Sequence, residues 1–254
     1  MIRRIINPKD IHKEMFAMPW SIYPYANYLK YGVSKEFFSL YFAGNCFFTR
    51  YHDSIQICSE SISDNEAKEV SNYIIENNIR MANGPTSCMN AIFDFLDKGR
   101  IEHGLIFRLK PFKTEANYII KYANNSNEFH EISELVCRAN SNNTGYYGLQ
   151  QYYDQIFSRF SEKYCRNWIC FVNNEIVGHI ATYAETPLYG VLGGLAVNEK
   201  YRGQGIAKNL LSYSISNLNS ENKDVYAFCY QEKLINFYNS ISFSSFPTSK
   251  ILFK

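Results

Sequence analysis

The chain has 254 residues with a formal net charge of +2, and hydrophobic residues make up 46% of it. This length allows one large domain or two modest ones, and the composition supplies a sizeable core. The 26 Lys and Arg are balanced by 24 Asp and Glu, which argues against a nucleic-acid partner, because such a protein presents a concentrated basic face.

Neither a membrane partner nor a metal site is expected. The sequence has no run of 18 apolar residues, and its N-terminal residues lack the apolar stretch of a signal peptide. The seven cysteines are scattered, without a Cys-x-x-Cys pair or a nearby cluster of histidines. These features favour reduced thiols in a cytoplasmic protein.

The N-terminal half predicts mixed α and β structure. Aromatic and β-branched residues favour short strands, while Asp64 and either Thr86 or Ser87 are good helix N-caps. The predicted elements are, in order, a short helix interrupted by turns (8–31), three strands (37–42, 46–51 and 54–58), a helix (64–77), a loop (83–85), a helix (86–96) and a strand (105–109).

A polar break at residues 111–115 is the predicted domain boundary. We expect a smaller α+β domain at residues 1–112 and a second domain at residues 113–254. The second domain predicts a strand (118–122), two helices (128–139 and 149–161) around a loop (141–145), a hairpin (168–172 and 176–184), a strand (190–197), a helix (205–218), a strand (225–230), a helix (234–240) and a strand-like tail (243–253).

The segment at residues 195–207 carries the most informative pattern. A predicted strand ends at Val197, a polar loop follows, and Gly203 and Gly205 precede an amphipathic helix. Glycines at such a turn let the backbone approach a ligand, and the free N–H groups of a helix N-terminus suit a pyrophosphate. The pattern is neither the Gly-x-Gly-x-x-Gly of dinucleotide-binding folds nor a P-loop, which makes dinucleotides and nucleoside triphosphates poor fits.

This segment resembles the acyl-CoA signature of the GNAT superfamily of N-acyltransferases, Arg/Gln-x-x-Gly-x-Gly/Ala, and occurs here as Arg202-x-x-Gly205-x-Ala207. Three further stretches strengthen the resemblance. Leu195-Ala196-Val197 resembles the end of the GNAT strand that binds pantetheine, residues 174–180 resemble the central hairpin, and residues 237–243 resemble the Leu/Phe-Tyr-x-x-x-Gly-Phe element with its proton-donating tyrosine. All four occur in the family order.

The resemblance implies an α+β fold with a mixed, mostly antiparallel sheet flanked by helices, and acetyl-CoA as the acyl donor. The smaller N-terminal domain is reminiscent of a degenerate second GNAT-like domain without a cofactor site. The residues implied in cofactor binding are Leu195, Ala196, Val197, Arg202, Gly203, Gln204, Gly205, Ile206, Ala207 and Gln231. Backbone N–H groups near Ala196 and Val197 are expected to stabilise the oxyanion that forms when an amine attacks the thioester.

Tyr238 is the implied proton donor to the leaving thiolate. The general base is open, because residues 190–194 contain no carboxylate where some relatives place one. Glu185 and His179 are candidate bases, with a chain of water molecules as the alternative. Two other departures from the family pattern are Gln231, where relatives often carry Asn, and Ser242, where Gly is usual.

The implied function is an N-acetyltransferase that acts on a primary amine of a small molecule or peptide, as a monomer or homodimer. A non-catalytic acyl-CoA-binding regulatory protein and a protein-modifying acyltransferase are the alternatives, and an acyl group longer than acetyl is also open. Two tyrosine pairs, Tyr146-Tyr147 and Tyr152-Tyr153, either belong to the core or line an aromatic acceptor pocket.

Overall fold

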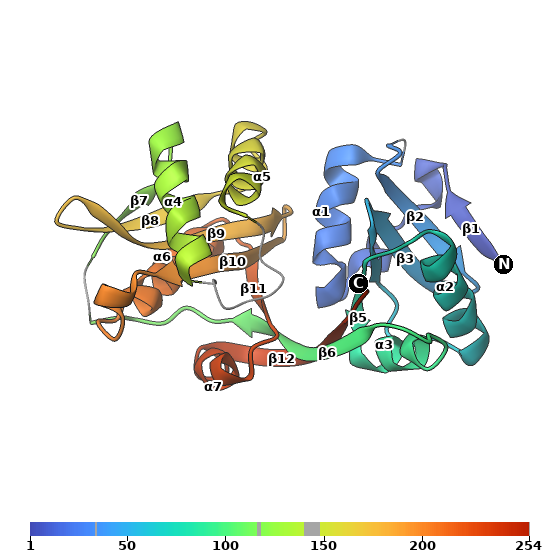
Figure 1. Cartoon of the computed structure of the whole chain (residues 1–254). Helices are drawn as coiled ribbons and strands as arrows, with labels where there is room; N and C mark the ends of the chain where they lie inside the picture. The colour runs from blue at the N-terminus through green and yellow to red at the C-terminus, as the bar shows by residue number, and fades with distance from the viewer. Residues whose placement is uncertain (34, 116–117, 140–147, 254) are drawn as a thin grey trace. The chain divides into compact units, whose positions relative to one another are not determined.

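The computed structural model of the protein describes residues 1–33, 35–115, 118–139 and 148–253 (Figure 1). In these residues seven α-helices flank twelve strands that pair mostly antiparallel, which confirms the predicted α+β fold class. Contacts divide the chain into two units. The N-terminal unit comprises Met1–Phe107 together with Phe228–Lys254, and the central unit comprises Arg108–Ala227.

The N-terminal unit contains a seven-stranded sheet with the order β1-β2-β3-β4-β5-β12-β6. The pairs from β1 to β4 and the β5–β12 pair are antiparallel, whereas β4 and β5 are parallel. The elements are β1 (Ile2–Ile5), α1 (Ile22–Tyr31), β2 (Phe38–Ala43), β3 (Cys46–Tyr51), β4 (Ser54–Ile57), α2 (Asp64–Glu76), β5 (Met81–Pro85), α3 (Thr86–Phe93), β6 (Arg100–Leu109), α7 (Glu232–Ser240) and β12 (Ser242–Leu252).

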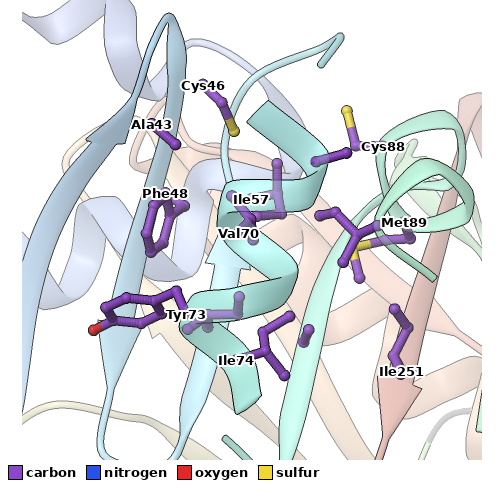
Figure 2. Packing of buried hydrophobic residues seen from close by; sticks show 14 of the residues in the cluster. Ala43, Cys46, Phe48, Ile57, Val70, Tyr73, Ile74, Cys88, Met89 and Ile251 are labelled. Atoms are coloured by element: carbon purple, nitrogen blue, oxygen red, sulfur yellow. The ribbon is translucent and has the colours of Figure 1, made fainter. Parts of the chain in front are cut away.

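Both faces of this sheet are covered. Side chains alternate along β3, so that Phe47 joins a cluster with Tyr25 of α1, while Phe48 joins a second cluster with residues of α2 and α3. Figure 2 shows this second core, in which Val70 and Ile74 of α2 lie among buried strand residues. Helix α1 therefore covers one face, and α2 and α3 cover the other.

The prediction of a loop at residues 83–85 is wrong, because these residues belong to strand β5. This strand pairs in parallel with β4 and antiparallel with β12, and its Gly84 packs so closely on β4 that an added Cβ would lie 2.8 Å from Ile57 Cβ. Pro85 ends the strand, where its missing N–H costs little. Strand β1 was also not predicted.

The C-terminal strand β12 belongs to the N-terminal unit. It pairs with β5 from Thr248 opposite Pro85 to Leu252 opposite Met81, and its Ile251 is fully buried in the core of α2 and α3. This grouping differs from a division between residues 112 and 113, and the separate roles of the two predicted domains remain a prediction.

The central unit is a five-stranded sheet, with the order β11-β10-β9-β8-β7, and three helices. Strands β10 and β11 are parallel, and the other pairs are antiparallel. The elements are β7 (Ile119–Tyr122), α4 (Ser126–Ala139), α5 (Leu149–Ser161), β8 (Asn167–Val172), β9 (Glu175–Glu185), β10 (Tyr189–Val197), α6 (Ile206–Ser220) and β11 (Asp224–Cys229).

Helices α4 and α5 lie on one face of the central sheet and α6 lies on the other (Figure 1). On β8, Ile169 packs with Phe129 of α4, whereas the next residue, Cys170, lies opposite Gly178, which α6 approaches closely. The alternation of side chains along a strand explains this division. None of the helices in the described residues combines the length and apolar character needed to cross a bilayer.

Candidate active site

Strand β10 separates from β11 before it ends. Its ladder with β11 runs from Tyr189 opposite Asp224 to Leu192 opposite Ala227. Beyond this point β10 continues to Val197 in its ladder with β9, where Val197 lies opposite Gly178. The last residues of β10 are therefore paired with β9 along one edge, and their other edge lies beyond the end of the β11 ladder. Such an edge can form strand-like hydrogen bonds with an extended ligand.

A β-bulge interrupts β10 between Gly193 and Ala196. Gly194 within it has φ +64°, a conformation that favours glycine. The fully buried His179 on β9 places its Nδ1 2.9 Å from the Gly194 carbonyl and its Nε2 3.0 Å from Asn167 Oδ1. Burial lowers the pKa of His179 to about 4, so the imidazole is neutral at pH 7. These contacts favour a role for His179 in holding the bulge.

The loop at residues 202–205, which we call the α6 loop, follows a 3-10 helix at Glu199–Tyr201 and leads to the N-terminus of α6. Gly205 is the N-cap of α6 with φ +84°, and it has no side chain with which to cap the helix. The first N–H groups of α6 therefore remain available to an anion at the positive end of the helix dipole. Gly203 has φ +79° and open space where a Cβ would lie. This backbone fits a pyrophosphate group.

Contacts within the central unit brace the α6 loop. The Tyr118 hydroxyl donates to the Gln204 carbonyl at 2.8 Å, and Gln204 Nε2 donates to the Lys200 carbonyl at 3.4 Å. Arg202 donates from Nε to the Val197 carbonyl at 3.3 Å and forms an ion pair with Glu199 at 3.1 Å. Arg202 thus anchors the loop to the end of β10. Its contact with a phosphate remains a prediction.

The predicted cofactor residues before and after this loop are continuous with it. Ala196 and Ile206 are buried, with 3% and 1% of their surface exposed, so they can offer only backbone groups to a ligand. Leu195, Val197 and Ala207 are half-buried. The structure therefore brings residues 195–197 and 202–207 together at one end of β10.

Tyr238 and Gln231 lie in the N-terminal unit. Tyr238, on α7, is half-buried and stacks on Phe107 with 5.4 Å between ring centroids. Burial, with a smaller contribution from Cys229, raises the pKa of Tyr238 to about 12. The phenol is therefore protonated at neutral pH, as a proton donor must be. Gln231 is the exposed N-cap of α7. The roles of both residues remain predictions.

Glu185 lies at the other end of the β9–β10 hairpin from the bulge. It pairs with Gly190, whereas His179 pairs with Ala196, six residues further along β10, or about 20 Å at ~3.3 Å per residue. A pocket of about 330 Å³ beside Glu185 lies at this same end of the hairpin and is lined by Phe160, Lys163, Tyr164, Cys165, Arg166 and Glu185.

Cations hold the Glu185 carboxylate in place. Arg166 donates to both of its oxygens at 2.8 and 2.6 Å, and Lys223 donates at 2.8 Å. Burial alone raises the pKa of Glu185, but hydrogen bonds from Arg166, Lys223 and Thr182 outweigh burial and hold the pKa below its usual value. A carboxylate in such a network accepts a proton less readily, and these contacts favour a structural role over the predicted role as a base.

We expect Glu185→Gln to destabilise the fold by roughly 1–3 kcal/mol at pH 7 and to leave acyl transfer largely intact. Because the folded-state pKa is depressed, the contribution of this carboxylate is present above the unfolded-state pKa of about 4.3 and is lost as pH falls through the folded-state pKa. Urea unfolding at pH 7 and below pH 4 checks this. The difference in free energy of unfolding between the parent and Glu185→Gln should be smaller at the lower pH. A loss of turnover without a loss of stability would instead support Glu185 as the general base.

Two tyrosines contact the β10 bulge, and only one of them, Tyr152, could be identified from the sequence. Tyr183 of β9 and Tyr152 of α5 both lie against Gly194. Tyr153, in contrast, stacks on His130 with 4.0 Å between ring centroids, as a packing residue does. The tyrosines at 146 and 147 lie outside the described residues. No local pattern marks Tyr183, because its neighbours at the bulge come from separate elements.

Comparison with known proteins identifies a family for part of the chain. The acetyltransferase (GNAT) family matches residues 127–243. No curated protein matches the sequence. A GCN5-related N-acetyltransferase from Kribbella flavida has a similar structure, with a TM-score of 0.64 and 10% identity over 91% of this chain and 95% of that chain.

Two further structures are similar over most of their length. A GNAT-family acetyltransferase from Colwellia psychrerythraea has a TM-score of 0.61 with 12% identity, covering 100% of both chains. A conserved protein of unknown function from Staphylococcus epidermidis has a TM-score of 0.57 with 11% identity, covering 89% of this chain and 97% of that chain. At these identities the likeness concerns the fold. Residues 127–243 of the chain thus form a domain of the acetyltransferase (GNAT) family.

Proposed function

We propose that the protein is an N-acetyltransferase that moves an acetyl group from acetyl-CoA to a primary amine. One observation supports this most strongly: the N-terminus of α6, whose N-cap Gly205 carries no side chain, follows the segment where β10 separates from β11 after one short connection. An anion site and a free strand edge thus lie next to each other along the chain. Acetyl-CoA presents the matching pair of groups, a pyrophosphate and an extended pantetheine arm.

In this proposal each part of the site has one task. The N–H groups of Ile206 and Ala207 at the start of α6 bind the pyrophosphate. The backbone edge of residues 195–197 orients the pantetheine arm. N–H groups near Ala196 and Val197 stabilise the oxyanion at the reacting carbonyl, a contribution of about 3–4 kcal/mol per donor. Tyr238 supplies the proton for the leaving thiolate.

The N-terminal unit supports a proposal that it derives from a second GNAT-like domain. The order β2-β3-β4-α2-β5-α3-β6 repeats the order β8-β9-β10-α6-β11-α7-β12. In both series the first three strands are antiparallel, and the helix crosses over to a parallel partner, as in the β4–β5 and β10–β11 pairs.

The two crossover helices differ at their N-termini. Helix α2 has a capping box, in which the Ser63 hydroxyl accepts from the Glu66 N–H and the Glu66 carboxylate accepts from the Ser63 N–H at 2.9 Å. Glu66 also accepts from the Asn45 N–H at 2.6 Å. A carboxylate therefore occupies the position that an anion would take, whereas Gly205 leaves the N-terminus of α6 open. We infer that only the central unit binds the acyl donor.

The direct test is calorimetric titration with acetyl-CoA, followed by a thiol-release assay over a library of primary amines. Binding together with amine-dependent release of CoA supports the proposal. Binding without release for any amine would favour the regulatory alternative, and the absence of binding would overturn both. Replacing acetyl-CoA by longer acyl-CoA donors in the same assay tests the choice of acyl group.

We expect Tyr238→Phe to keep the affinity for acetyl-CoA and to lower turnover by ~10-fold or more, because the ring remains and the donated proton is lost. Tyr213→Phe, which removes the hydroxyl of an exposed tyrosine on α6, is the matched control. Because the Tyr238 pKa is about 12, the acid form persists at high pH, and turnover should not decline between pH 8 and 10 through this group. Equal turnover of Tyr238→Phe and the parent would assign the proton to another donor.

A further inference from the structure

Two tyrosine hydroxyls meet at the β10 bulge. The Tyr183 ring lies across Gly193, where an added Cβ would come within 2.8 Å of Tyr183 Cδ2. At Gly194 an added Cβ would lie 2.8 Å from the Tyr183 hydroxyl and 3.3 Å from the Tyr152 hydroxyl. The phenol oxygens of Tyr183 and Tyr152 therefore pack directly against Gly194 and leave no room for a side chain at this position.

The strand irregularities explain how Tyr183 reaches this position. Opposite β10, the register of β9 shifts where Val191 pairs with Ala184 and Leu192 pairs with Thr182, which leaves Tyr183 as the extra residue. A bulge of this kind turns its side chain out of the regular alternation, and bulges are enriched beside active sites. Two bulges, one in each strand, thus bring the Tyr183 hydroxyl to Gly194.

Arg159 adds a positive charge over the ring of Tyr183. It follows Tyr152 by seven residues on α5, which places both on one face of the helix. Its guanidinium carbon lies 5.8 Å from the centroid of the Tyr183 ring, and its side chain is half-buried. The Tyr183 ring therefore contacts the bulge and lies beside a cation.

Arg159 differs from the other arginines of the central unit in its ion pairing. The others form ion pairs with carboxylates: Arg108 with Asp224, Arg138 with Glu134, Arg166 with Glu185 and Arg202 with Glu199. Within the described part of the chain, Arg159 pairs with no carboxylate. A half-buried guanidinium gains most from a planar, bidentate acceptor such as a carboxylate.

We propose that Arg159 and Tyr183 form the acceptor site and that the acceptor is a small amine bearing a carboxylate, such as a free amino acid. This inference rests on the proposed acetyl transfer at β10. The Tyr183 hydroxyl accepts a hydrogen bond from the acceptor amine at the bulge, and Arg159 binds the acceptor carboxylate. Only the Tyr183 ring separates the Tyr183 hydroxyl from the Arg159 guanidinium. The amine and the carboxylate of the acceptor are therefore only a few bonds apart.

The test compares acetylation of a panel of free amino acids with that of their carboxamides. Each pair is measured in the parent, in Arg159→Gln and in Tyr183→Phe, so that differences in amine basicity cancel between proteins. The control is Arg138→Gln, which removes an exposed guanidinium from the neighbouring helix α4. Acetyl-CoA titration and thermal unfolding establish that each variant is folded and binds the donor.

We expect Arg159→Gln to lower kcat/KM for the acids by about 10- to 100-fold, mainly through KM, and to leave the carboxamides unchanged. Arg159→Lys should restore part of the loss, and Tyr183→Phe should lower kcat/KM for acids and carboxamides alike. An equal loss for acids and carboxamides in Arg159→Gln, or no loss, would overturn the proposal.

A binding measurement separates this inference from the proposed function. Free amino acids are titrated into the CoA-loaded protein by calorimetry. If no amine is acetylated but an amino acid binds and Arg159→Gln abolishes the binding, the proposed function fails and the recognition site stands. If amines without a carboxylate are acetylated and no amino acid binds, acetyl transfer stands and the recognition site is wrong.

Discussion

Gly205→Glu is expected to abolish acetyl-CoA binding. Gly205 caps α6 with φ +84°, so a side chain there is strained, and the new carboxylate would lie where the pyrophosphate is expected. A like-charge contact at about 4 Å costs about 4 kcal/mol at an effective dielectric constant of ~20, which corresponds to a loss of about 1,000-fold in affinity. Calorimetric titration with acetyl-CoA measures this loss.

Two variants separate the effect of the added charge at Gly205 from the effect of backbone strain. Gly205→Ala adds the backbone strain without the charge, so its loss in affinity should be much smaller, with a destabilisation of about 1–2 kcal/mol. Ser216→Glu places the same carboxylate at an exposed position in the C-terminal half of α6 and should leave binding unchanged. Unchanged affinity in Gly205→Glu would remove the donor site from the N-terminus of α6.

The candidate donor site could be predicted from the sequence because its parts are local. A strand, a glycine turn and a helix follow one another within residues 195–207, and hydrogen bonding and helix capping act over such short separations. Amphipathic helices were similarly accessible. The helix predicted at residues 149–161 has the bounds of α5, Leu149–Ser161, because its apolar residues recur at helical spacing.

The features that could not be predicted from the sequence depend on contacts between segments that are far apart in the chain. The five residues of β5 contain the turn-like series Asn-Gly-Pro, and they become a strand because β4 and β12 supply hydrogen bonds on both sides. The group formed by Arg159, Tyr183 and Gly194 likewise joins α5, β9 and β10. The register of β9 against β10 brings Tyr183 to Gly194, and the packing of α5 brings Arg159 over the Tyr183 ring.

The second large expected effect is the loss of solubility when strand β12 is separated from β5. We expect a fragment of residues 113–254 to aggregate, although it keeps every predicted cofactor residue. In the full chain Ile251 is fully buried in the core of the N-terminal unit, and β12 pairs with β5. The fragment loses β5 and that core, which exposes a strand edge and Ile251, whose burial contributes about 1.5–3 kcal/mol. Size-exclusion chromatography and solubility after expression measure the result.

Two controls distinguish loss of the β5–β12 pairing from a general effect of cutting the chain. A protease site inserted at Lys113, an exposed residue, allows the full chain to fold first, and the two pieces should stay associated after cleavage. Coexpression of residues 1–112 with the fragment should restore solubility, since β5 then meets β12. If the fragment alone were soluble, monomeric and as active as the full chain on the same amine, β12 would not need the N-terminal unit. The boundary predicted between residues 112 and 113 would then separate two independent domains.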